Sequence, residues 1–161
     1  MEQNRILPQA DQRVRRVSEQ FGHAVQLLFD TGQGKFSVAA AHTWILPAVL
    51  HRQICFAFNR DGCPIAYISW AYVSDETLQR LQKDDVMALD PSEWNEGLNL
   101  WIVDFVAVKR MAPFVARFFR RELRLHGDYL HGMKRKADGS VRRLVTLPLR
   151  NLTSGKTKDA A

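Results

Sequence analysis

The segment from Leu100 to Val108 is the strongest constraint on how this chain of 161 residues can fold. Its residues are apolar apart from Asp104, which is the pattern of a central β-strand covered on both faces. A strand of that kind needs a packed layer on each side. We therefore expect this segment to lie at the centre of the domain and to be flanked by helices.

Hydrophobic periodicity and turn residues predict the other elements. Apolar residues recur at helical spacing over 13–29, and Ser37 is placed to cap a second helix that runs to Leu50. Aromatic and β-branched residues over 53–59 and 64–73 predict a hairpin with a two-residue turn at Asp61-Gly62. The remaining predicted elements are a short helix over 74–83, a helix from Pro113 to about Leu125, and a second hairpin with strands over 129–136 and 141–149. The predicted fold class is α+β.

Length and composition predict one domain, because 161 residues with 46% hydrophobic residues can form one core but hardly two. We place it at 13–150, after a flexible N-terminus (1–12) and before a disordered tail (151–161). No stretch resembles a signal peptide or a membrane span, so we expect a cytoplasmic protein. No metal site is expected. The net charge of +6 and pI near 9.7 favour anionic partners. A nucleic-acid-binding domain is a rival interpretation that rests on the pI alone, and we do not expect that partner.

Asp104 is the leading candidate for a catalytic residue. An ionisable carboxyl inside an apolar strand is costly unless it is paired, hydrogen-bonded or neutralised. A carboxyl perturbed in this way is a marker of functional sites. The alternative is a structural role, as the partner of an arginine or as the cap of a loop.

Five histidines are available as a base, and two of them are candidates for the site. The apolar stripe of the first helix is predicted to consist of Val14, Val17, Phe21, Ala24, Val25 and Leu28. On a helical wheel His23 lies opposite this stripe, so we expect it to face solvent. His42 lies near the apolar side of the second helix and is expected to face the core or a cleft beside the sheet. A buried structural histidine is the alternative interpretation of His42.

Two further groups of residues suggest binding surfaces. Five aromatic residues are candidates to line a groove for an acyl chain, or they are ordinary core aromatics: Tyr67, Trp70, Tyr72, Trp94 and Trp101. The helix after Pro113 is expected to bury one side, formed by Phe114, Val115, Phe118 and Phe119. Four arginines of this helix recur at positions i, i+3, i+4 and i+7, and they form either a solvated cationic face or a docking stripe for an acidic partner. These are Arg117, Arg120, Arg121 and Arg124.

Three segments of the chain resemble motifs of one family, from about Val17 to Ala107 and more loosely to Leu149. They are Pro64-Ile65-Ala66-Tyr67-Ile68-Ser69-Trp70-Ala71 after Arg60-Asp61; Trp94, Gly97 and Trp101-Ile102-Val103-Asp104-Phe105-Val106-Ala107; and Leu46-Pro47-Ala48 with Phe21-Gly22-His23 upstream. The first two are similar to the patterns P-V-A-Y-C-S-W-A and W-x-x-G-x-x-x-W-I-I-D-W-I-A of the toxin-activating lysine acyltransferases that modify RTX cytolysins.

The resemblance implies an acetyltransferase-like (GNAT-like) fold, often dimeric. It implies an enzyme that transfers a fatty acyl group from acyl carrier protein to a lysine of a target such as an RTX-type protoxin, with no other cofactor. A histidine and an aspartate are catalytic in that family, and Asp104 falls on the aspartate. The acyl groove would include Tyr67, Ser69, Trp70 and Trp101, and the arginine stripe would steer acidic acyl carrier protein.

The chain departs from the family pattern at the catalytic histidine. The family has S-P-x-H-R before the second helix, whereas this chain has Thr31-Gly32-Gln33-Gly34-Lys35, with Gln33 where histidine is expected. A glutamine cannot act as a base near neutral pH. Three interpretations stay open: His42 has taken over, His23 is brought near by an altered loop, or the protein is a binding module that transfers nothing.

Overall fold

The computed structural model describes residues 11–33, 37–83, 89–135 and 141–149. The fold is a mixed α and β fold with a five-stranded sheet, compatible with the predicted α+β class. The elements are α1 (Gln12–Asp30), α2 (Val38–Leu50), β1 (Ile54–Phe58), β2 (Pro64–Val73), α3 (Asp75–Lys83), the 3-10 helix η1 (Pro91–Trp94), β3 (Asn99–Ala107), α4 (Ala112–Glu122), β4 (Tyr129–Arg135) and β5 (Val141–Pro148). No helix in these ranges is long and apolar enough to cross a membrane.

The sheet has the strand order β1-β2-β3-β4-β5, and its neighbours are antiparallel except for β3 and β4. The predicted central strand is therefore confirmed, because β3 is the third of five. A parallel pair needs a crossover connection, and α4 supplies it between β3 and β4. The parallel register extends only from Leu100↔Leu130 to Ile102↔Gly132, although both strands continue beyond these residues.

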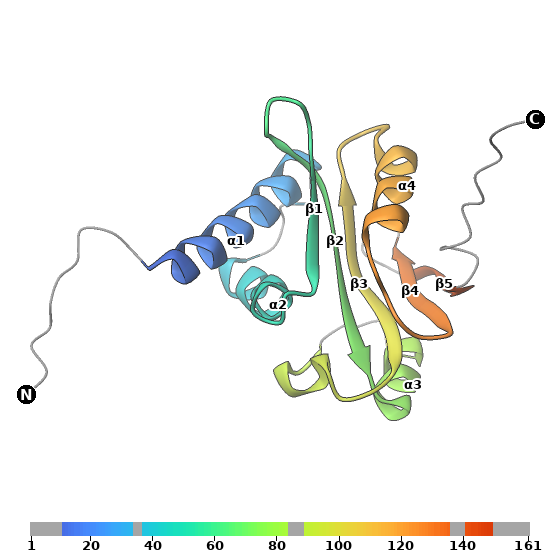
Figure 1. The fold of residues 1–161 in the computed structure, drawn as a ribbon. Coiled ribbons are helices and arrows are strands. Elements are labelled where there is room, and N and C mark those ends of the chain that lie inside the picture. Colours follow the sequence, from blue (N-terminus) through green and yellow to red (C-terminus); the bar gives the residue numbers. More distant parts are fainter. Residues whose placement is uncertain (1–10, 34–36, 84–88, 136–140, 150–161) are drawn as a thin grey trace, which may run out of the picture.

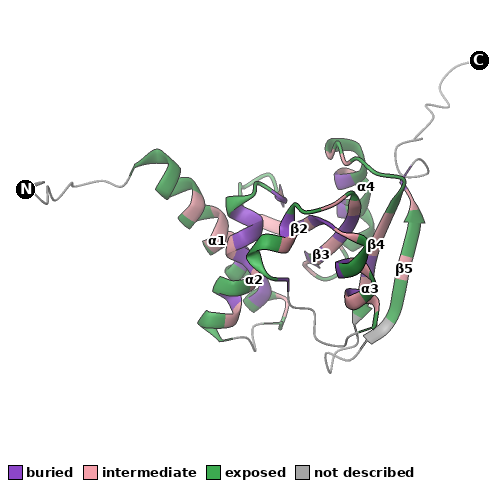
Figure 2. Cartoon of the chain, turned by 90° about the horizontal axis from the view of Figure 1, so that it is seen from below, coloured by how far each residue is buried: buried purple, intermediate pink, exposed green. Residues whose placement is uncertain are grey.

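Helices cover both faces of the sheet, as the apolar pattern of β3 requires. Figure 1 shows α1 and α2 on one side of the strands and α4 on the other. On the first side Trp101 and Val106 of β3 belong to one core cluster with Leu27 of α1. On the second side, Ile68 of β2 packs in a cluster with Phe119 of α4. Figure 2 shows the buried residues of α1 and α2 where the two helices meet, while the first turns of α1 are largely exposed.

A β-bulge in β3 determines which face Asp104 occupies. Ser69 pairs with Asp104 and the next residue, Trp70, pairs with Ile102, so Val103 is the extra residue of β3. Side chains alternate between the faces of a strand, and one extra residue reverses the alternation beyond it. Ile102 accordingly packs in the α4-side cluster, whereas Asp104 lies opposite Ser69 on the side of α1 and α2. Without the bulge, Asp104 would share the face of Ile102.

Several predicted details are confirmed and others are corrected. Ser37 caps α2, since its Oγ accepts the Ala40 N–H at 3.1 Å. The first hairpin turn is longer than the predicted two residues, because the Asn59 N–H donates to the Cys63 carbonyl and three residues lie between them. Gly62, the last of these three, has a φ of +78°, as expected for a three-residue turn that ends in a left-handed residue. Residues 1–10 of the predicted flexible N-terminus (1–12), the second hairpin turn at 137–140 and the predicted tail (151–161) lie outside the described residues.

Candidate functional site

Asp104 of β3 and Tyr67 of the neighbouring strand β2 form a hydrogen-bonded pair on the face covered by α1 and α2. The Tyr67 hydroxyl donates to Oδ2 of Asp104 at 2.5 Å. Tyr67 is fully buried, with 0% of its surface exposed, and Asp104 is partly buried. The bulge at Val103 makes this contact possible, because it turns Asp104 to the face that carries Tyr67.

Burial shifts the proton affinities of both members of the pair. Desolvation raises the pKa of Asp104 to about 6, although the hydrogen bonds from Tyr67 and from the Phe105 backbone favour the ionised form. Burial and the neighbouring Asp104 charge raise the pKa of Tyr67 far above its ordinary value, so its phenol remains a donor. Asp104 therefore exchanges a proton near neutral pH, where an ordinary aspartate is always ionised.

The Asp104 carboxyl has a hydrogen-bond partner in Tyr67 but no ion-pair partner among the described residues. Within the described residues no arginine, lysine or histidine forms an ion pair with it. Asp104 lies inside β3, so it does not cap a loop either. In the described part of the chain, Asp104 is therefore neither the ion-pair partner of an arginine nor the cap of a loop.

His23 does not face solvent as predicted. Its side chain is partly buried, and its ring meets the rings of Phe56 and Phe58 of β1 edge-on, at centroid distances of 5.8 and 5.6 Å. The predicted apolar stripe of α1 included Val14 and Val25, which are exposed, and did not include Leu27, which is fully buried. The buried face of α1 is therefore rotated from the predicted stripe, and His23 lies at its margin.

His42 lies on the exposed side of α2, which corrects the prediction that it faces the core or a cleft. Within the described residues it forms no hydrogen bond, ion pair or ring contact. The other histidines contact different parts of the fold, namely Trp94 and Asn95 for His51, Tyr72 for His126, and Thr146 for His131. None of the five imidazoles bonds to Asp104 in the described part of the chain. No group of three His, Cys, Asp or Glu side chains there is close enough to hold a metal ion.

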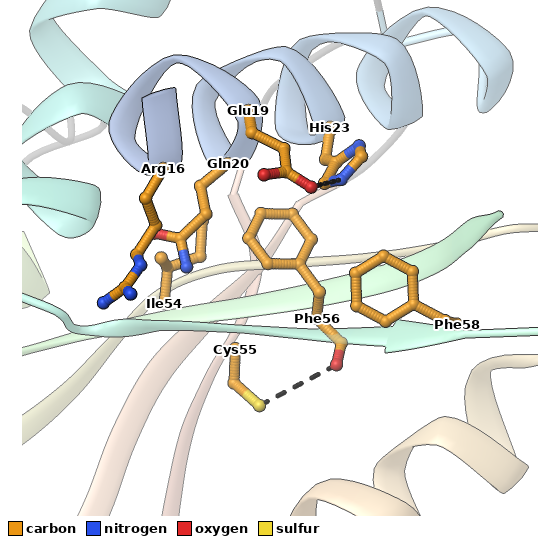
Figure 3. Close-up of a pocket in the computed structure, with 8 residues that line it drawn as sticks. All are labelled: Arg16, Glu19, Gln20, His23, Ile54, Cys55, Phe56 and Phe58. Carbon is orange, nitrogen blue, oxygen red and sulfur yellow. Dashed lines mark hydrogen bonds and ion pairs between the residues drawn. The ribbon is translucent and has the colours of Figure 1, made fainter. Parts of the chain in front are cut away.

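A groove with a volume of about 360 Å³ lies between α1 and the edge strand β1, and we call it the α1–β1 groove. Figure 3 shows polar side chains of α1 above it and the aromatic side chains of β1 below the helix. Its lining residues are Arg16, Glu19, Gln20, His23, Ile54, Cys55, Phe56 and Phe58. Phe56 also packs against Tyr67 at a ring distance of 5.9 Å. One aromatic ring therefore separates this groove from the Tyr67–Asp104 pair.

The aromatic residues expected to form an acyl groove lie on two different faces of the sheet. Tyr67, Ser69 and Trp101 are buried on the side of α1 and α2, and Trp70 packs on the side of α4. None of the four lines the α1–β1 groove. Sequence analysis missed Phe56 and Phe58, which do line it. Their alternation in β1 was the available signal, since residues two apart share one face of a strand.

The predicted arginine stripe is exposed but shorter than expected. Helix α4 ends at Glu122 and Leu123 is extended, so Arg124 lies beyond the helix and only Arg117, Arg120 and Arg121 belong to it. Arg121 also pairs with the adjacent Glu122 at 2.8 Å. Phe114, which we placed on the buried side of this helix, is 71% exposed. It lies at i−3 and i−7 from Arg117 and Arg121, on the same side of α4.

Gln33, which replaces the family histidine, lies directly after α1 and is exposed. Its side-chain amide donates to the Thr31 hydroxyl at 3.4 Å, and its backbone N–H donates to the Leu28 carbonyl at 2.8 Å. Both contacts are local to the end of the helix. Gly34 and Lys35 lie outside the described residues.

The fold and the site define a mixed α/β domain with a proton-exchanging carboxyl in its central strand. Residues 14–144 match the RTX toxin acyltransferase family, and the chain belongs to that family. The family resemblance of the sequence motifs is thereby confirmed.

The chain is similar to named relatives over part of its length. It is 41% identical over 63 residues to the leukotoxin-activating lysine-acyltransferase LktC of a Pasteurella haemolytica-like species. The matched residues make up 39% of this chain and 37% of that protein. It is 36% identical over 72 residues to the RTX-II toxin-activating lysine-acyltransferase ApxIIC of Actinobacillus pleuropneumoniae, covering 45% and 44%. It is 37% identical over 65 residues to the protein-lysine myristoyltransferase RtxC of Kingella kingae, covering 40% and 38%. The chain thus spans about two fifths of the length of these relatives.

Proposed function

We propose that this protein is a lysine acyltransferase that transfers a fatty acyl group from acyl carrier protein to a lysine of an RTX-type toxin. Membership of the RTX toxin acyltransferase family supports the class of reaction. The observation that carries the proposal is the Asp104 carboxyl, which is partly buried, hydrogen-bonded by Tyr67 and ionisable near pH 6. A lysine ammonium must lose its proton before it attacks a thioester, and a group that titrates near neutral pH can take that proton.

The chemistry requires two protons to leave the lysine nitrogen. The nitrogen attacks the thioester carbonyl carbon, a C–N bond forms and the C–S bond breaks. One proton leaves with the thiol of the acyl carrier protein, and the other is taken by a base and released to water. We propose Asp104 as that base, because no described imidazole contacts it and because its raised pKa makes the carboxylate a stronger base than an ordinary aspartate. His23 is the second candidate, since its ring lies in the α1–β1 groove.

The acyl chain is proposed to lie in the α1–β1 groove. Ile54, Phe56 and Phe58 give the groove an apolar floor, and Phe58 is 49% exposed although it is aromatic. Exposed apolar surface of this kind marks binding sites for apolar ligands. The contact of Phe56 with Tyr67 brings one end of the groove close to the Tyr67–Asp104 pair. This location replaces the earlier expectation of a groove lined by the β2 and β3 aromatics.

Acyl carrier protein is proposed to dock on α4, in the cytoplasm. Arg117 and Arg121 would present positive charge to an acidic partner. Phe114, which is exposed on the same side of α4, would add an apolar contact with that partner. Charge of this sign steers association more than it sets affinity. We further propose an acetyltransferase-like fold and a homodimer. The bulged central strand, and its parallel partner that pairs over three residues only, support the former.

The test is transfer of a fatty acyl group from acyl carrier protein to an RTX toxin fragment, read as added mass on a lysine. The comparison includes wild type, Asp104→Asn, His23→Ala and His42→Ala. We expect loss of transfer in Asp104→Asn and near wild-type transfer in His42→Ala, whose side chain is exposed and has no partner among the described residues. Wild-type transfer in Asp104→Asn would overturn the role of Asp104.

A binding module that transfers nothing is the second candidate function. Gln33 in place of the family histidine favours it, as does the lack of a described imidazole in contact with Asp104. This candidate predicts that the chain forms a complex with acyl carrier protein or with the toxin fragment while no lysine gains mass. Transfer by the wild-type chain would exclude it.

A further inference from the structure

Packing of the core does not require a hydroxyl on the side chain of residue 67, which is Tyr67. It is fully buried in the main core, where phenylalanine would fill almost the same volume. A buried hydroxyl must find a partner, and the partner here is the one carboxyl of β3. The hydroxyl is therefore matched to Asp104 and to no other described side chain.

We infer that Tyr67 is a positioning residue for the transfer reaction, which orients the Asp104 carboxylate by donating a hydrogen bond to its Oδ2. This inference rests on the proposed function, and it assigns Tyr67 a task different from lining the acyl groove.

The strand register explains how Tyr67 reaches Asp104. Tyr67 pairs with Val106, and Ser69 pairs with Asp104, so tyrosine and aspartate are diagonal neighbours on one face. Diagonal neighbours on a sheet are within reach of a long aromatic side chain. The bulge at Val103 is what brings Asp104 onto this face. The 2.5 Å distance across that diagonal lies at the short end of the range of about 2.5–2.7 Å that is typical of a hydroxyl and a carboxylate.

The tyrosine is itself held in place. Its ring has no exposed surface and packs against Phe56. A ring fixed in this way cannot swing its hydroxyl to another acceptor without opening the core. Its raised pKa keeps the phenol protonated, so it acts only as a donor.

Among the described residues, Tyr67 is the only side chain that forms a hydrogen bond with Asp104. From α1, the ionisable side chains toward the sheet are Arg16, Glu19 and His23, which line the groove over β1 and form no ion pair with Asp104. The buried residues of α2 are apolar, and the only ionisable residue of that helix, His42, is exposed. Strand β1 contributes no charged side chain on this face. Removing the Tyr67 hydroxyl should therefore change the pKa of Asp104.

The experiment compares Tyr67→Phe with Tyr72→Phe. Tyr72 is a matched control, because it is a buried tyrosine of the same strand whose hydroxyl accepts the His126 backbone N–H and does not contact Asp104. Both variants and wild type are labelled with ¹³C at the aspartate carboxyl, and the Asp104 signal is identified by its absence in Asp104→Asn. Its chemical shift is followed from pH 4 to pH 9.

Tyr67→Phe should raise the pKa of Asp104, because a hydrogen bond that favours the carboxylate is lost. A rise by one unit would reduce the ionised fraction at pH 6 about fivefold, and the acid limb of the transfer rate would move to higher pH by the same unit. We expect kcat above pH 8 to fall about tenfold, since the carboxylate is no longer oriented, while KM stays within twofold. Tyr72→Phe should leave all three quantities unchanged.

An Asp104 titration that is the same in wild type and Tyr67→Phe would overturn the inference. This readout needs no transfer, so it remains decisive where the proposed function fails. Where Tyr67→Phe does not fold, Tyr67→3-fluorotyrosine replaces it. The fluorinated phenol is the stronger donor and should lower the Asp104 pKa, and an unchanged pKa in that variant would equally overturn the inference.

Discussion

Replacing Asp104 by asparagine should stabilise the fold, although we expect it to abolish the reaction. The change keeps the shape of the side chain and removes its charge. Asp104 is partly buried without an ion-pair partner among the described residues, and the amide oxygen of asparagine can still accept the Tyr67 hydroxyl. A catalytic group that the fold holds at the expense of stability behaves in this way.

The magnitude follows from the shifted proton affinity. Burial raises the pKa of Asp104 from an ordinary 3.8 to about 6. Each pKa unit corresponds to about 1.4 kcal/mol, so ionised Asp104 destabilises the folded state by at most about 3 kcal/mol. Because the folded pKa is the higher one, this penalty is complete above about pH 6 and disappears as the pH falls toward 4. Asp104→Asn should therefore be more stable than wild type by up to about 3 kcal/mol at pH 8 and about equally stable at pH 4.

Urea unfolding at several values between pH 4 and pH 8 measures this difference. Asp128→Asn is the control, because Asp128 is exposed and its side chain forms no hydrogen bond or ion pair with a described residue. Its unfolding free energy should stay within about 0.5 kcal/mol of wild type at every pH. A variant Asp104→Asn that is less stable than wild type over the whole range would refute the reasoning, because the carboxylate would then be a structural partner.

Three further predictions concern other parts of the molecule. Gly97→Ala should lower the unfolding free energy by about 3 kcal/mol in urea unfolding, because an added Cβ would overlap the Val73 backbone; a loss below 0.5 kcal/mol would contradict this close approach. The double variant Arg117→Glu, Arg121→Glu should slow association with acyl carrier protein about tenfold at low salt by stopped-flow fluorescence, and an unchanged rate would exclude α4 as the docking helix. Phe58→Asp should raise KM for a long acyl chain more than for a short one with little change in melting temperature, and an equal effect on both chains would remove the groove from the acyl site.

The order of the elements and the central position of β3 could be predicted because both depend on local patterns. Apolar periodicity located the helices, and the apolar run around Asp104 located the covered strand. Asp104 itself stood out for the same reason, since a charge in such a run needs an explanation. The face that Asp104 occupies could not be predicted, because the bulge at Val103 is a property of how two strands pair and not of either sequence alone.

The neighbours of Asp104 depend on tertiary packing, which the sequence left open. His23 seemed to face solvent because Val14 and Val25 were counted in the apolar stripe of α1, yet both are exposed and Leu27 is buried instead. Phe114 was placed in the core for a similar reason. The partnership of Tyr67 with Asp104 needed the register between β2 and β3, and aromatic composition gives no register.

The pH dependence of lysine acylation by the wild-type chain tests the central claim most directly. Single-turnover transfer from acyl carrier protein to the toxin fragment, followed by mass, should rise through a midpoint near pH 6 and then level off, because ionised Asp104 takes the proton. A rate that instead climbs about tenfold per pH unit up to pH 9 would show that water, and not Asp104, deprotonates the lysine.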